Sequence, residues 1–115
     1  MKIIKIVKLN KGEEKNKHGK VLDENSNEFE IFMKNLNSLL NNKFKLLEKL
    51  EYSDFFNISF ENPKSGNRYR LLLHKITAES ILLRYNPQMK NYTKLLRIKS
   101  KNNYKKLLEA IKNLY

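Results

Sequence analysis

Arginine and tyrosine are concentrated in the second half of this chain. All four arginines and five of the six tyrosines lie between residues 62 and 115. An arginine guanidinium binds phosphate bidentately and stacks on flat rings, and a tyrosine ring offers a stacking face for a base. This combination predicts recognition of a polyanion that also carries aromatic faces, and nucleic acid is the polymer that fits that description.

Of the net charge of +12, +11 lies in the same half. Residues 1–61 carry eleven Lys against ten Asp and Glu, whereas residues 62–115 carry thirteen Lys and Arg against only Glu79 and Glu109. A compositional bias toward lysine would affect both halves, so the asymmetry indicates an electrostatic surface. The alternative interpretation is a solvated basic face that serves solubility alone.

Hydrophobic periodicity predicts the elements that would carry these residues, within a single domain over 1–115. A strand is expected at Lys2–Leu9, followed by a long polar loop at 10–27. Helical spacing predicts an amphipathic helix of about fifteen residues from Asn27, and a second, shorter helical piece from Phe44 to Glu51. The period then changes to two, which predicts strands at 55–60, 68–76, 80–85 and 94–99, before a last helix that Ser100 caps.

The expected architecture is α+β, in the order β-α(α)-β-β-β-β-α. An antiparallel sheet of four to five strands would carry its helices on one face. The other face is expected to be open to solvent or to a partner.

Strand alternation assigns the cations of the meander to this open face. Tyr69, Leu71 and Leu73 are expected to point inward, and so are Ile81, Leu83 and Tyr85 in the next strand. One consistent register then places five cations on a single outward surface: Arg68, Arg70, Arg84, Arg97 and Lys99. Tyr92, expected in the loop before the last strand, is the candidate ring for base stacking.

The sequence offers little catalytic chemistry. It has no cysteine and only two histidines, of which His74 is expected on the cationic face. His74 is the candidate base for RNA cleavage, and Arg84 is the other residue that could be essential if the protein is a ribonuclease. No phosphate-binding glycine loop, nucleophile elbow or metal-ligand cluster is present, so neither a metal nor a cofactor is expected.

The predicted layout resembles the RelE/ParE family of small basic toxins, whose ribosome-dependent members cut mRNA with Arg, Lys, Tyr or His residues on the sheet. The resemblance covers most of the chain in layout and includes no shared motif. It implies comparable positions for a set of sheet residues: Arg68, Arg70, His74, Arg84, Tyr85 and Lys99. The second half alone is similar to Whirly-type single-strand binders.

The preferred hypothesis is a small, basic, non-enzymatic protein that holds RNA or single-stranded DNA on its sheet. The first alternative is a RelE/ParE-like, ribosome-dependent mRNA interferase toxin. The second is an inhibitor from a phage or mobile element, for example an anti-CRISPR protein, that docks on a nucleic-acid-handling complex. The charged start of the chain is no signal peptide and no apolar stretch is long enough to span a membrane, so a cytoplasmic protein without a membrane partner is expected.

Overall fold

A computed structural model describes residues 27–75, 77, 79–99 and 103–115 of the chain. The strand expected at Lys2–Leu9 and the loop at 10–26 lie outside the described residues. The cap expected at Ser100 is wrong, because the last helix begins at Tyr104 with Asn103 at its N-cap position. The described elements, in chain order, are α3 (Asn27–Asn42), β1 (Lys45–Glu51), β2 (Phe55–Glu61), β3 (Arg68–His74), β4 (Ser80–Asn86), β5 (Asn91–Ile98) and α4 (Tyr104–Lys112).

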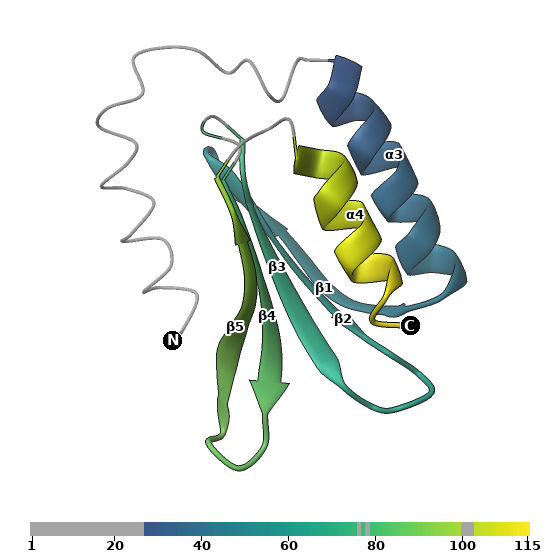
Figure 1. The fold of residues 1–115 in the computed structure, drawn as a ribbon, viewed down its shortest axis with the longest axis vertical. Helices are drawn as coiled ribbons and strands as arrows, with labels where there is room; N and C mark the ends of the chain where they lie inside the picture. The colour runs from purple at the N-terminus through teal and green to yellow at the C-terminus, as the bar shows by residue number, and fades with distance from the viewer. Residues whose placement is uncertain (1–26, 76, 78, 100–102) are drawn as a thin grey trace.

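The five strands form one antiparallel sheet in the order β1-β2-β3-β4-β5, so each strand pairs with the next along the chain. Both described helices cover the same face of this sheet (Figure 1). The predicted α+β class, the antiparallel sheet and the single helical face are therefore confirmed. No helix in the described part of the chain is long and apolar enough to cross a membrane.

The turn between β2 and β3 is fixed by Asn62 and Gly66. The Asn62 Oδ1 accepts the Lys64 backbone N–H at 2.8 Å, and the Gly66 N–H donates to the Asn62 carbonyl at 2.8 Å. Gly66 has φ +78°, a left-handed conformation that glycine adopts without a Cβ penalty. The Asn62 Nδ2 also donates to the Leu114 carbonyl at 2.8 Å, which ties this turn to the C-terminus.

The hydrophobic core lies between the two helices and the sheet. The rings of Phe32 in α3 and Tyr104 in α4 stack with centroids 4.8 Å apart. The sheet contributes to this core the residues of β2, β3 and β4 that point toward the helices, which include Phe60, Leu71 and Leu82. All three are at most 1% exposed, so the face under the helices is fully packed.

The expectation of a helical piece from Phe44 to Glu51 is wrong, because residues 45–51 form β1, the strand at one edge of the sheet among the described residues. The spacing of Phe44, Leu47 and Leu50 resembles a helix. The segment instead pairs antiparallel with β2, from Lys45 opposite Glu61 to Glu51 opposite Phe56. A bulge at Leu47 interrupts the register, and Leu47 is 41% exposed. Tertiary pairing has overridden a local helical pattern.

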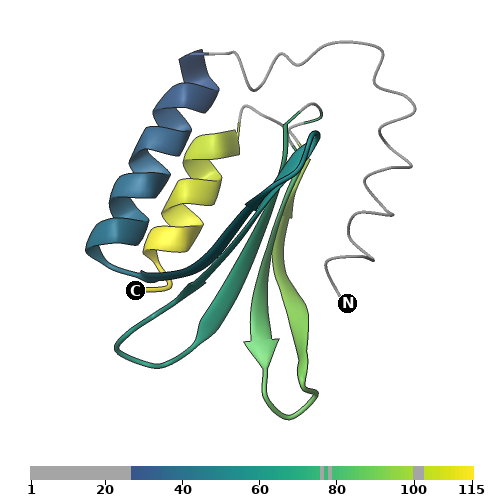
Figure 2. The ribbon, with the colours of Figure 1, turned by 180° about the vertical axis from the view of Figure 1, so that it is seen from behind.

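We call the side of the sheet away from α3 and α4 the outer face; Figure 2 shows the molecule from behind. The expectation that this face is open fails at its centre. Phe55 and Asn57 of β2 are each 1% exposed, and Leu72 and His74 of β3 are 8% and 3% exposed. Only the parts of the outer face beyond this buried centre are accessible to a partner.

Candidate nucleic-acid interface

Strand register shows which predicted cations share the outer face, because residues directly opposite in an antiparallel pair point to the same side. Arg70 alternates with the core residues Tyr69 and Leu71 and so lies on the outer face. Its partner in β4 is Leu83, and the partner of Leu83 in β5 is Lys94. Lys94 is therefore an exposed outer-face cation that the sequence prediction did not include.

Three of the remaining predicted cations also have outer-face positions. Arg68 is two residues before Arg70 in β3. Arg97 pairs with Ile81, which pairs with the outer-face residue Leu72. Lys99 is exposed directly after β5 and continues the alternation of Arg97.

Arg84 lies on the other face, so the prediction of five cations on one surface is wrong at this position. It pairs with the core residue Tyr69, while its neighbours Leu83 and Tyr85 point outward. The run Ile81-Leu82-Leu83 is apolar throughout and fits two opposite registers. The structure selects the one that buries Leu82, which is 1% exposed opposite Leu71. Arg84 remains exposed at the end of the sheet that the helices do not cover.

Tyr92 belongs to β5 and not to a loop. Its ring meets the Tyr85 ring edge to face with centroids 5.3 Å apart, and the Arg70 guanidinium carbon lies 4.1 Å from the Tyr92 centroid. One face of the ring is therefore covered by a cation. Tyr92 holds the Arg70 side chain in place, which is a different role from the free stacking ring that was predicted.

Two of the predicted cations have carboxylate partners. The Arg97 Nε donates to Glu79 Oε2 at 2.6 Å, and its Nη2 contacts the same oxygen. The Arg68 Nε lies 3.5 Å from Glu61 Oε1. A partnered arginine offers a polyanion less net charge, so these two positions contribute less to an interface than the sequence predicted.

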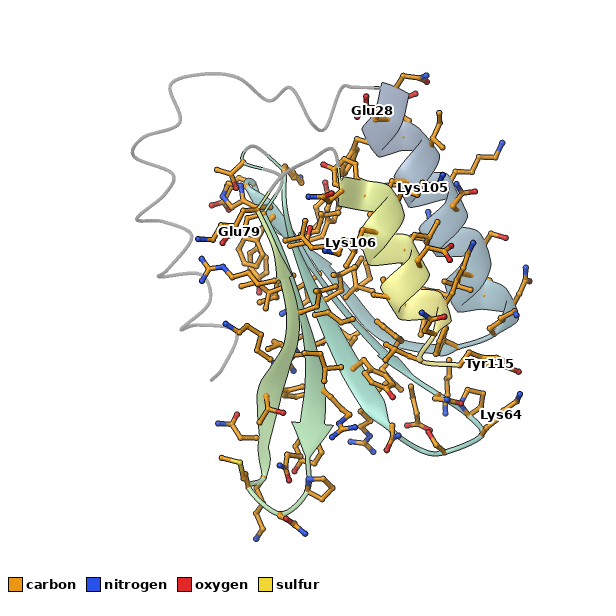
Figure 3. The ribbon with its side chains drawn as sticks, viewed as in Figure 1. Glu28, Lys64, Glu79, Lys105, Lys106 and Tyr115 are labelled. Atoms are coloured by element: carbon orange, nitrogen blue, oxygen red, sulfur yellow. The ribbon has the colours of Figure 1, made fainter. Side chains whose placement is uncertain are left out.

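Three exposed cations share the end of the β4–β5 hairpin, residues 84–94, which we call the distal ribbon. It carries the exposed cations Arg84, Lys90 and Lys94 and contains no Asp or Glu. It extends past the ends of both helices (Figure 1). Glu79, the nearest preceding carboxylate in the sequence, lies at the opposite end of the hairpin (Figure 3).

The turn of the distal ribbon is held by its own side chains. The Asn86 Oδ1 accepts the backbone N–H groups of Gln88 at 3.0 Å and Met89 at 3.3 Å. Lys90 has φ 52°, and the Tyr92 N–H donates to Asn91 Oδ1 at 2.8 Å. Local bonds of this kind favour a defined turn, and they present Met89, which is 64% exposed, at the tip.

His74 does not stand exposed on a cationic surface, as was predicted. It is 3% exposed, its Nε2 is 3.9 Å from Asp54 Oδ2, and its Nδ1 accepts the Thr77 N–H at 3.1 Å. Lys75 is equally buried: its Nζ lies 2.7 Å from Glu51 Oε2 and 4.7 Å from the Phe56 ring centroid. Both side chains are packed into the fold, and neither is placed to meet a polymer.

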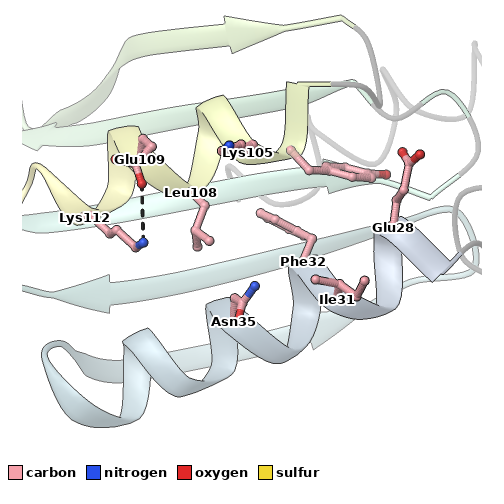
Figure 4. Close-up of a pocket in the computed structure, with 9 residues that line it drawn as sticks. Glu28, Ile31, Phe32, Asn35, Lys105, Leu108, Glu109 and Lys112 are labelled. Carbon is pink, nitrogen blue, oxygen red and sulfur yellow. Dashed lines mark hydrogen bonds and ion pairs between the residues drawn. The ribbon is translucent and has the colours of Figure 1, made fainter.

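A groove of about 640 Å³ separates the exposed sides of α3 and α4 (Figure 4). Phe32 and Leu108 are among the apolar residues that line it. Its charged lining residues are two carboxylates and two lysines: Glu28, Glu109, Lys105 and Lys112. Lys112 is already 3.3 Å from Glu109, so this groove has no excess of positive charge to attract a polyanion.

No three His, Cys, Asp or Glu side chains within the described ranges are placed to hold a metal ion. No protein-family model, curated protein or solved structure matches this chain. The likeness to RelE/ParE toxins and Whirly-type binders therefore stays one of predicted layout. The distal ribbon, with Arg70 beside it, is the strongest candidate for a functional surface.

Proposed function

We propose that this chain is a nucleic-acid-binding protein without catalytic activity, and that the distal ribbon and Arg70 bind the phosphate backbone. The observation that carries the proposal is the projection of three exposed cations on a carboxylate-free hairpin beyond the packed core. Positive charge that served solubility alone would be interspersed with acids over the surface. Here three exposed cations share one extension that has no acid, next to an arginine that a tyrosine ring keeps in place.

The structure sets the expected salt dependence. The distal ribbon and Arg70 together offer four cations to phosphates: Arg70, Arg84, Lys90 and Lys94. Each phosphate contact contributes a slope of about −0.9 in the logarithm of affinity against the logarithm of salt for duplex DNA, and somewhat less for single strands. Four contacts therefore predict a loss of affinity of about 10²-fold between about 50 and 200 mM salt.

Fluorescence anisotropy with labelled RNA, single-stranded DNA and duplex DNA tests this proposal. Wild-type protein should bind at least one of the polymers, with the salt dependence given above. The variant Lys90→Gln/Lys94→Gln should bind it more weakly, whereas Lys105→Gln/Lys112→Gln, which removes the same charge from α4, should not. If no polymer binds at low salt, or if the α4 variant loses as much affinity as the ribbon variant, the proposal is wrong.

The ribonuclease alternative receives no support from the described residues. Its proposed base, His74, is buried on the outer face, and the other candidate catalytic residue, Arg84, lies on the opposite face. A general base must reach the proton that it removes, within hydrogen-bond distance or through one water. The inhibitor alternative becomes the leading one if the protein binds a nucleic-acid-handling complex but no naked polymer.

A further inference from the structure

The distal ribbon carries cations on both of its faces. Lys94 lies on the outer face, because it pairs with Leu83, the partner of Arg70. Arg84 lies on the opposite face, because it pairs with Tyr69. Both are exposed, and Lys90 adds a third cation at the turn between them. A single polynucleotide strand lying along one side of the ribbon would contact only one of the first two.

Cations on opposite faces suit a polyanion that surrounds the ribbon on two sides. A double helix provides this arrangement, because each groove is lined by two phosphate backbones. The major groove of B-form DNA is about 12 Å wide and 8.5 Å deep, which admits a two-stranded β-ribbon. The paired strands of such a ribbon are about 4.8 Å apart, so side chains on both faces can reach the groove walls.

The turn of the distal ribbon is suited to contact base edges at the bottom of the major groove. Met89 is the most exposed large apolar side chain at the tip, and the Asn86 bonds hold the turn in one shape. Base edges in the major groove include the thymine methyl group, which an apolar side chain can contact. Lys90, directly after Met89, would lie at the same depth.

We infer that the ligand of the distal ribbon is double-stranded B-form DNA, and that the ribbon enters its major groove with Arg84 and Lys94 on opposite walls. This inference rests on the proposed nucleic-acid-binding function and specifies the polymer. It also predicts discrimination against double-stranded RNA, because the major groove of the A-form helix is too deep and narrow for side chains to read.

The experiment compares three labelled ligands: a 16-base-pair DNA duplex, the RNA duplex of the same sequence and one of the DNA strands. Arg84→Gln and Lys94→Gln are measured singly and together, with Lys105→Gln/Lys112→Gln as the control for charge. We expect the DNA duplex to bind about tenfold more tightly than either other ligand. Each single variant should lose about fivefold, as for one exposed charge pair, and lower the salt slope by about one. The double variant should lose about 25-fold, because distant contacts add.

The outcomes separate this inference from the proposed function. Equal or tighter binding of the single strand or the RNA duplex overturns the groove inference and leaves nucleic-acid binding intact. A loss confined to one of the two single variants does the same, because it places the polymer on one face. If none of the three ligands binds, both the inference and the proposed function fail.

Discussion

Replacing Tyr92 with alanine tests whether this ring positions Arg70, as the geometry indicates. The Arg70 guanidinium carbon is 4.1 Å from the ring centroid, and both side chains are half-buried. A cation–π contact contributes about 0.5–1 kcal/mol when exposed and about 2 kcal/mol when desolvated, so about 1 kcal/mol is expected here. Tyr92→Ala also removes the edge contact with Tyr85, which adds about 1 kcal/mol to the loss.

A double-mutant cycle isolates the Arg70–Tyr92 term from the other contacts of the ring. The free energy of unfolding is measured by urea denaturation for wild type, Tyr92→Ala, Arg70→Ala and the double variant. We expect Tyr92→Ala to lower it by about 2 kcal/mol, and the coupling energy between the two residues to be about 1 kcal/mol. With an m-value of about 1.5 kcal/mol/M, the single change lowers the urea midpoint by about 1.3 M.

The matched control is the cycle between Tyr92 and Arg97. Arg97, like Arg70, is an arginine on the outer face. It lies in β5, five residues after Tyr92 and about 16 Å from it, and it pairs with Glu79. Its coupling to Tyr92 should lie within about 0.3 kcal/mol of zero. A coupling between Arg70 and Tyr92 that is no larger than this control would refute the assigned role of the ring.

Other substitutions test the fold and the ion pairs. Leu36→Ala, at a fully buried position of α3, should lower the free energy of unfolding by about 2–5 kcal/mol in urea denaturation, and a loss below 1 kcal/mol would contradict its place in the core. Gly66→Ala should lower the free energy of unfolding by about 1 kcal/mol in the same assay. A Cβ at this position meets no atom within 4 Å, so the loss would come only from the left-handed backbone, and an unchanged urea midpoint would contradict that conformation. Glu79→Gln should change the free energy of unfolding by less than about 1 kcal/mol, since the Arg97 side chain is 44% exposed. Because it releases Arg97 from its ion pair, it should tighten nucleic-acid binding at low salt, and weaker binding would contradict this reasoning.

Most of the sheet could be predicted from the sequence because its signals are local. Phe56, Ile58 and Phe60 alternate with polar residues, and the turn-forming residues at 62–67 predict that the chain reverses there into the β2–β3 hairpin. The apolar stripes of α3 and α4 likewise follow from helical spacing. The edge strand β1 could not be predicted this way, since its leucines fit a helix and only pairing with β2 decides their conformation.

The candidate site was harder to predict because it depends on which way each strand faces. The three apolar residues 81–83 are compatible with either face, and a one-residue change of register moves every side chain of a strand to the other side. Arg84 was therefore assigned to the wrong surface. Tyr92 was predicted to lie in a loop because a longer connection was expected after Asn86. The hydrogen bonds that Asn86 Oδ1 accepts close the turn within a few residues, and they have no unambiguous sequence signal. The outer-face position of Lys94 could be assigned only from the observed pairing of β4 with β5.

The most direct test of the central claim is the binding of wild-type protein to the labelled DNA duplex at about 50 and 200 mM salt, beside Arg84→Gln/Lys94→Gln. Binding by the distal ribbon predicts that wild-type affinity falls about 10²-fold between the two salt concentrations. It also predicts that the variant is about 25-fold weaker at low salt and has a salt slope smaller by about two. Tight duplex binding that the variant retains in full, with an unchanged slope, would contradict the claim that the distal ribbon is the nucleic-acid interface.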